Sequence, residues 1–236
     1  MATSTATSVP RPTCWILTTA DRARSARRDI DVARSACYTR AVDDPARCPR
    51  CLYRRELCLC PALAAEGPIV TRTRVVILRH HTEKHRSSNS GRLAHLALPH
   101  SELHDVSAPD RDTPVSVPVL GEGAWLVFPD GPPWTVSPAP PPRTLVFLDA
   151  TWQQARRMRQ RLPYLRGLPM LHLTPVPAAE RLRNAPQAGM VSTIEAIATA
   201  LRLVESDAVA EPLERLFAVA VDHARRAGRR SSAATG

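Results

Sequence analysis

The stretch 145–152 constrains the fold more than any other part of the chain. It opens with four apolar residues, branched and aromatic ones among them, which is typical of a buried strand. From Thr151 onward apolar residues recur at helical spacing, and Thr151 with Gln154 fits a capping box at a helix start. Asp149 therefore lies where a strand ends and a helix begins, which is where ligands bind in open α/β sheets. A purely structural alternative is that Asp149 caps the helix and Trp152 fills the core.

Apolar runs bounded by turn residues divide the rest of the chain into short elements. Further strands are expected at 75–78, 102–106, 124–128 and 170–173. Helices are expected at 92–98, 152–165, 194–204 and 213–224. Because short strands alternate with helices, we expect an α/β fold with a mostly parallel sheet and helices on both faces.

At 236 residues the chain is long enough for one α/β domain with small additions. Composition divides it into a flexible extension at 1–45, a cysteine knuckle at 46–66, a main domain at 67–226 and a disordered tail at 227–236. No segment resembles a secretory signal, and no apolar run is long enough to span a membrane. We therefore expect a cytoplasmic protein, and the sequence leaves its oligomeric state open.

The charge of the chain is strongly positive and comes almost wholly from arginine. The formal net charge is +10 at pH 7, and Lys84 is the only lysine. A flat guanidinium group with several donors suits phosphate and base recognition better than an ammonium group does. An excess of this size indicates a polyanionic partner, with nucleic acid as the first expectation. A GC-rich genome also enriches arginine over lysine, so charge alone does not decide between these explanations.

Four cysteines lie close together in two pairs, and these are Cys48, Cys51, Cys58 and Cys60. Two pairs separated by a short loop can converge on one tetrahedral ion, and four thiolates suit structural zinc. The spacing of the second pair, Cys-x-Cys, is tighter than the usual one. Disulfides are not expected in a reducing cytoplasm, and redox or iron–sulfur chemistry remains an alternative.

A histidine-rich turn follows the first expected strand. It does not fit a zinc metalloprotease, because Glu83 follows His81 by two residues and a zincin needs the glutamate directly after the histidine. The polar cluster from Asn89 to Arg92 then opens a helix. Such a start presents backbone N–H groups and an arginine to an anion or carboxylate, although an ordinary N-cap explains it equally well.

A second polar signature precedes the expected helix at 194–204. It joins a loop that carries Arg181 and Arg183 to a helix start at which Ser192 and Glu195 have capping-box spacing. A capping box is common in proteins, so this pair taken alone indicates a helix start and no function.

The order of these motifs resembles the DTW-domain family, the tRNA-uridine aminocarboxypropyltransferases. A four-cysteine knuckle precedes a strand that leads into His-x-x-Glu and Asn-Ser-x-Arg-Leu. A strand ending in Phe-Pro, the naming motif Asp149-x-Thr151-Trp152, Leu-Arg and Ser-Thr-x-Glu-Ala then follow. The resemblance covers roughly 48–203. The chain departs from the family pattern at three positions, which are Thr82, Ser90 and Ala150.

The resemblance implies a SPOUT-like α/β fold with a C-terminal trefoil knot that holds S-adenosylmethionine. It also implies transfer of the 3-amino-3-carboxypropyl group of S-adenosylmethionine to N3 of a uridine in tRNA, which releases methylthioadenosine. Uridine N3 is a weak nucleophile until its proton leaves, so this reaction needs a base near that nitrogen.

Site residues follow from the resemblance together with this chemistry. We expect Asp149 to be the base, Thr151 to orient it, and Trp152 to stack on a base or to wall the pocket. The residues expected to hold S-adenosylmethionine are Asn89, Arg92, Phe128, Pro129, Arg183, Ser192, Thr193 and Glu195. A SPOUT-type RNA methyltransferase and a non-catalytic zinc-knuckle RNA-binding protein are the two alternatives.

Overall fold

A five-stranded parallel sheet forms the centre of the protein in the computed structural model, which describes residues 44–107, 117–130, 133–134, 136–173 and 191–228. The strands are β1 (Arg74–Arg79), β2 (Ser101–Asp105), β3 (Ala124–Val127), β4 (Thr144–Asp149) and β5 (Met170–Leu171). Their order across the sheet is β2-β1-β4-β3-β5, and every neighbouring pair is parallel. The prediction of a mostly parallel sheet is confirmed.

The neighbouring strands β1 and β4 each carry a run of four apolar residues, Val75–Leu78 and Leu145–Leu148. A central parallel strand is covered on both faces, so a continuous run of apolar side chains can be buried there. The register places Arg79 opposite Asp105 of β2 on one side and opposite Asp149 of β4 on the other. The carboxyl ends of these three strands therefore lie in one row, with charged side chains at the edge.

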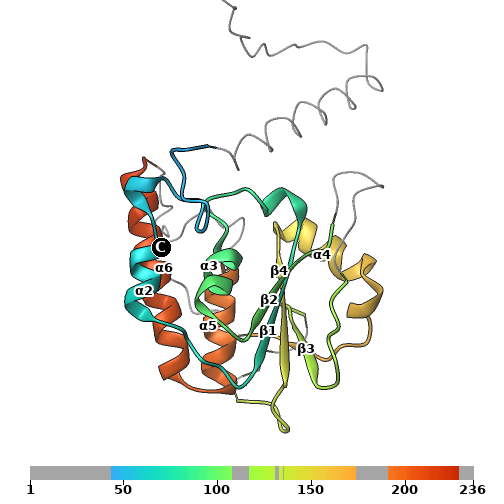
Figure 1. The fold of residues 1–236 in the computed structure, drawn as a ribbon. Helices are drawn as coiled ribbons and strands as arrows, with labels where there is room; N and C mark the ends of the chain where they lie inside the picture. The colour runs from blue at the N-terminus through green and yellow to red at the C-terminus, as the bar shows by residue number, and fades with distance from the viewer. Residues whose placement is uncertain (1–43, 108–116, 131–132, 135, 174–190, 229–236) are drawn as a thin grey trace, which may run out of the picture. The chain divides into compact units, whose positions relative to one another are not determined.

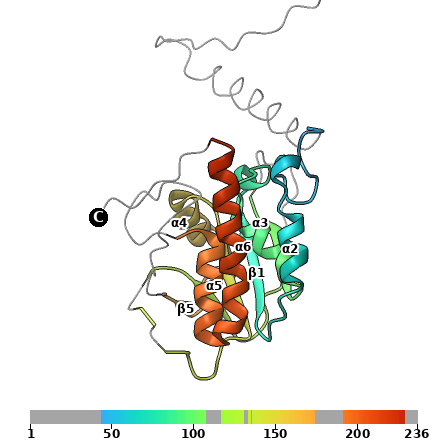
Figure 2. The ribbon, with the colours of Figure 1, turned by 90° about the vertical axis from the view of Figure 1, so that its left-hand side faces the viewer.

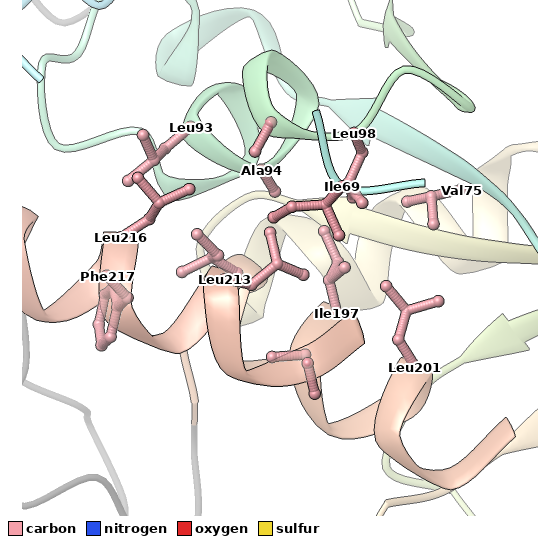
Figure 3. Packing of buried hydrophobic residues seen from close by; sticks show 14 of the residues in the cluster. Ile69, Val75, Leu93, Ala94, Leu98, Ile197, Leu201, Leu213, Leu216 and Phe217 are labelled. Carbon is pink, nitrogen blue, oxygen red and sulfur yellow. The ribbon is translucent and has the colours of Figure 1, made fainter. Parts of the chain in front are cut away.

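One face of the sheet is covered by helices from both halves of the chain (Figure 1). These helices are α2 (Cys60–Glu66), α3 (Ser90–Ala97), α5 (Thr193–Val204) and α6 (Asp207–Arg226). Figure 2 shows α5 and α6 side by side, and α2 packs against α6. Figure 3 shows how Ala94 of α3 and Val75 of β1 gather with Ile197 and Leu213 in one buried cluster.

The opposite face carries α4 (Trp152–Arg161), which buries Ala155 and Met158 against the sheet (Figure 1). The prediction of helices on both faces is therefore confirmed. The helical spacing at 152–165 is broken at Pro163, after which a single 3₁₀ turn, η3 (Pro163–Leu165), completes the layer. A proline disfavours helical geometry in the residue before it, which explains why α4 ends at Arg161.

Some predictions fall on residues outside the described ranges. They include most of the extension at 1–45, the tail beyond 228, and the loop that carries Arg181 and Arg183. The expected trefoil knot stays a prediction. Within the described ranges, no helix is both long enough and apolar enough to cross a membrane.

Candidate active site

Asp149 at the end of β4 joins the starts of two helices. Its Oδ2 accepts a hydrogen bond from the side-chain amide of Asn89, the N-cap residue of α3. Its Oδ1 accepts a hydrogen bond of 2.8 Å from the hydroxyl of Thr193, the first residue of α5. The side-chain oxygen of Asn89, Oδ1, accepts from the backbone N–H of Arg92 at 2.7 Å, so Asn89 caps α3 with its oxygen and binds Asp149 with its amide nitrogen.

The surroundings of Asp149 exclude water. The residue is 4% exposed, and the close backbone approach of Gly91 covers its carboxylate. Burial raises the pKa of Asp149, and the nearby Glu83 carboxylate raises it further, whereas the hydrogen bonds from Asn89 and Thr193 lower it. The carboxylate is thus enclosed among protein groups and does not face an open cavity.

The start of α4 is built as the sequence predicts. Thr151 is the N-cap residue, and it forms a complete capping box with Gln154. The amide of Gln154 also donates a hydrogen bond of 3.1 Å to the hydroxyl of Thr82, in the 3₁₀ turn η2 (His81–Glu83) after β1. The Thr151 side chain therefore fixes the direction of α4 and has no described contact with Asp149.

The start of α5 is also a confirmed capping box. The backbone N–H of Ser192 donates to Oε2 of Glu195 at 2.7 Å, and the N–H of Glu195 donates to the Ser192 hydroxyl at 3.4 Å. The remaining oxygen of Glu195, Oε1, is buried and has no hydrogen-bond partner among the described residues. A buried carboxylate oxygen without a partner is able to accept a hydrogen bond from a ligand.

A pocket opens at the carboxyl ends of β3, β4 and β5, beside the start of α5. Its cavity volume is about 130 Å³, and the pocket opens to solvent. Its wall is mostly apolar and includes Phe128, Pro129, Trp152, Ser192 and Thr193. The rings of Phe128 and Trp152 lie 6.4 Å apart between centroids. An apolar pocket with aromatic side chains and a few polar groups in its wall suits a purine nucleoside.

One ionisable side chain, that of His172, belongs to the described lining of this pocket. Asp149 does not line it, although its neighbours Leu148 and Ala150 do. The connection between Asp149 and the pocket therefore runs through Thr193, which contacts both.

Arg92 lies away from the pocket. Its guanidinium group donates to the backbone carbonyl oxygen of Arg86 at 3.1 Å and to that of Lys84, so it holds the turn before α3. Burial lowers the pKa of Arg92 to about 10, which leaves it charged at neutral pH. Its role as a ligand of the cofactor carboxylate stays a prediction, as does that of Arg183, which lies outside the described residues.

The four cysteines of the knuckle converge. All four sulfur atoms lie within 4.8 Å of one another, and Cys48 to Cys60 and Cys51 to Cys58 are each 3.7 Å apart. A zinc ion with four thiolates at about 2.3 Å in a tetrahedron separates its sulfur atoms by about 3.8 Å. The cysteine geometry therefore fits a structural, fully coordinated metal.

Sequence reasoning found most of this region but missed three of its members. Gly91, Gln154 as a ligand of Thr82, and His172 in the pocket wall were not singled out. Gly91 belongs to the polar cluster that opens α3, but its close approach to Asp149 can be seen only in the structure. His172 lies at the carboxyl end of β5 as Asp149 lies at the carboxyl end of β4, and this position is the signal that could have indicated it.

Fold and site together define an α/β protein with a mostly apolar pocket at the carboxyl ends of parallel strands. The chain belongs to the DTW domain family, whose model matches residues 45–225.

Relatives of known name are similar at modest identity. A protein of Drosophila melanogaster named tRNA-uridine aminocarboxypropyltransferase 2 is 28% identical over 186 residues, which cover 70% of each chain. The proteins of the same name from Macaca fascicularis and Mus musculus are each 24% identical over 75% of this chain and 64% of their own length.

Among solved structures, the SAM-dependent rRNA:acp-transferase Tsr3 from Vulcanisaeta distributa is similar to this chain. The identity is 22% and the TM-score is 0.46, with coverage of 67% of this chain and 80% of that one. A likeness this distant supports no conclusion about the site.

Proposed function

We propose that the protein transfers the 3-amino-3-carboxypropyl group of S-adenosylmethionine to N3 of a uridine in tRNA. The observation that carries this proposal is the apolar pocket at the carboxyl ends of β3, β4 and β5, in a chain of the DTW domain family. The names of similar proteins support this reaction, because three of them are called tRNA-uridine aminocarboxypropyltransferase 2.

The residues of the pocket fit S-adenosylmethionine. Phe128, Pro129 and Trp152 would hold its adenosine, and the backbone and hydroxyls of Ser192 and Thr193 would lie along it. Glu195 does not line the pocket, but its capping-box partner Ser192 does, and the buried Oε1 atom of Glu195 has no described partner, so we assign it to the ammonium group of the amino-acid end. Bound S-adenosylmethionine supplies an activated carbon next to a sulfonium leaving group.

The reaction forms a bond between uridine N3 and the methionine Cγ and breaks the bond from that carbon to sulfur. Methylthioadenosine leaves, and the proton of N3 goes to a base. Selection of Cγ over the methyl carbon is a matter of positioning, because both are attached to the same sulfonium.

Asp149 is proposed to act mainly by positioning, through Thr193. Both of its oxygens are bound by Asn89 and Thr193, and it does not line the pocket. His172 is the ionisable group in the described wall and is the better placed acceptor for the proton. This differs from the prediction made from the sequence, in which Asp149 is the base.

Two substitutions separate these roles. Asparagine at position 149 can keep the contacts with Asn89 and Thr193, so Asp149→Asn retains much of the single-turnover rate if Asp149 positions Thr193. If Asp149 is the base, the same variant loses the rate at every pH although its melting temperature and S-adenosylmethionine affinity stay normal. His172→Gln then loses the rate in the first case and keeps it in the second.

The finer architecture is proposed with the function. The four cysteines would hold a structural zinc ion, and the C-terminal part of the domain would form a SPOUT-type trefoil knot that holds S-adenosylmethionine. The protein would work in the cytoplasm, where its tRNA substrate is found.

The deciding experiment is a single-turnover reaction of purified protein with unmodified tRNA and S-adenosylmethionine, with both products identified by mass spectrometry. The expected result is a uridine with the added aminocarboxypropyl mass, together with methylthioadenosine. A methylated nucleoside with S-adenosylhomocysteine would make the protein an RNA methyltransferase instead. If neither product forms and the protein still binds tRNA, it is an RNA-binding protein without this activity.

A further inference from the structure

Arginines are neutralised by carboxylates on the side of the molecule formed by α5 and α6. The ion pairs there are Arg202 with Asp207 and Glu214, Arg215 with Glu66 and Glu211, Arg226 with Asp222, and Arg72 with Glu205. On this side of the molecule, carboxylates therefore balance the positive charge of these arginines.

The α4 side differs in its charge. No acidic residue occurs from Ala150 to Ala179, and five arginines lie in that interval. The outer face of α4 consists of Gln153, Arg156, Arg157, Gln160 and Arg161, all of them exposed. Because these positions are three or four residues apart, they form one continuous strip along the helix.

The three arginines of this strip, Arg156, Arg157 and Arg161, have no ion pair or hydrogen bond within the part of the chain that the structure describes. Arg166, just after η3, is exposed in the same way. Like charges held together on one helix repel one another by a few tenths of a kcal/mol per pair. An arrangement that keeps them together without counter-charges suits a polyanion that supplies the negative charge.

The strip adjoins the pocket. Trp152 and Ala155, on the first turns of α4, line the pocket, and Arg156 follows directly. Arg159, the fifth arginine, turns inward, where it pairs with Asp130 and lies 5.1 Å from the ring centre of Phe128 in the pocket wall. One helix therefore carries the pocket wall on its inner side and the arginines on its outer side.

The dimensions and chemistry of the strip fit a nucleic-acid backbone. From Gln153 to Arg161 the helix rises about 12 Å, a length over which one nucleic-acid strand presents on the order of three phosphates. A membrane surface is less well matched, because the large exposed apolar residues of the described chain, Val70, Val117, Val119 and Val136, lie outside α4. Arginine side chains with glutamines between them are typical of phosphate and sugar contacts.

We propose that the outer face of α4 binds the sugar–phosphate backbone of the RNA substrate and so holds the target nucleotide over the pocket. The proposal rests on the proposed function, since it names where that function's substrate would bind. It adds a surface of this chain to which no role has been assigned.

The test compares two variants that lose the same charge. The first is Arg156→Gln, Arg157→Gln and Arg161→Gln together, and the control is Arg72→Gln, Arg215→Gln and Arg226→Gln together. The control arginines are exposed, and such exposed ion pairs contribute little to stability. Fluorescence anisotropy with labelled, unmodified tRNA measures the dissociation constant at several salt concentrations, and calorimetry measures binding of S-adenosylmethionine.

The α4 variant is expected to bind tRNA at least about tenfold more weakly near 150 mM salt. The slope of log K for tRNA binding against log salt concentration should become less steep by about two. The control variant and S-adenosylmethionine binding should change little. Equal weakening by both variants, or no weakening by either, would overturn the proposal. Loss of binding to anionic phospholipid vesicles with unchanged tRNA binding would overturn it in favour of a membrane surface.

The binding assay is independent of the reaction, so the two proposals fail separately. If the wild-type protein binds tRNA through α4 and makes no aminocarboxypropyl product, the surface stands and the proposed function fails. If the α4 variant transfers the group with an unchanged kcat/KM for tRNA, the function stands and the surface fails.

Discussion

A β carbon on Gly91 would lie 2.7 Å from Cγ of Asp149, closer than such atoms approach in proteins. Helix α3 can therefore lie against the end of β4 only with glycine at this position. The contact covers both carboxylate oxygens, which would lie 2.8 and 3.0 Å from that carbon. The hydrogen bonds of Asn89 and Thr193 and this backbone approach together fix Asp149 from three directions.

The first prediction concerns Gly91→Ala. Alanine is the better helix former by roughly 1 kcal/mol, so a collision-free site would be stabilised by the change. Here we expect a net loss of about 1–3 kcal/mol in the free energy of unfolding. Urea denaturation measures this value in Gly91→Ala, in Asp149→Ala and in the double variant. Because Asp149→Ala removes the atoms that collide, the penalty of Gly91→Ala should vanish there, and a penalty of equal size in both backgrounds would disprove the collision.

The second prediction concerns the aromatic wall. Trp152→Ala should weaken S-adenosylmethionine binding by about tenfold, because the adenosine loses its contact with one of the aromatic rings in the pocket wall. Trp152→Phe should keep most of the affinity. Trp125→Phe serves as the control, since Trp125 contacts Trp134 edge to face and does not line the pocket. Calorimetric titration gives the dissociation constants, and equal affinities for all three variants would place the nucleoside elsewhere.

The third prediction concerns the cysteine cluster. Purified protein should contain about one zinc ion per chain, measured by inductively coupled plasma mass spectrometry. Cys60→Ser should lose the metal and lower the melting temperature, whereas Cys37→Ser, outside the cluster, should keep both. A wild-type protein that is free of metal and melts at the same temperature with and without a strong chelator would rule out a structural ion.

The fourth prediction concerns pH. Burial lowers the pKa of His80 to about 4, and it also lowers the pKa of His81, His85 and His95. In the unfolded chain histidine titrates near pH 6.5, so below that pH the unfolded state binds more protons than the folded state does. Stability from these histidines is therefore full above about pH 6.5 and declines as the pH falls toward 4.

His80→Asn isolates one of these groups. The ring nitrogen Nδ1 of His80 accepts from the backbone N–H of Thr82, and an asparagine oxygen can take the same place without titrating. The variant should lose less stability than the wild type between pH 7 and pH 4.5 in urea denaturation. A steeper pH dependence in the variant would contradict the assigned cause.

Local sequence patterns are sufficient to predict a strand or helix whose end is marked by a charged or capping residue. The strand up to Asp149, the capping box of Thr151 with Gln154 and that of Ser192 with Glu195 are all confirmed. These features depend on residues within a few positions of one another, so periodicity and capping chemistry reveal them.

The partners of Asp149 could not be derived in this way. Asn89 and Thr193 are 60 and 44 residues away from it in the sequence, and their contacts depend on β1 and β4 being neighbours in the sheet. For the same reason, the contacts of Arg92 with the carbonyl oxygens of the preceding turn do not follow from its position at a helix start. Spacing indicates which residues open a helix, but the sheet order decides what that helix faces.

The hydrogen bond between Asp149 and Thr193 also bears on when the pocket can form during synthesis of the chain. A growing chain that has emerged as far as β4 has Asn89 and Asp149 in place, but it lacks Thr193 and the α5 wall of the pocket. A nascent chain on the ribosome therefore has no complete nucleoside site until α5 has left the exit tunnel. The proposed binding of S-adenosylmethionine would therefore come late in the synthesis of the chain.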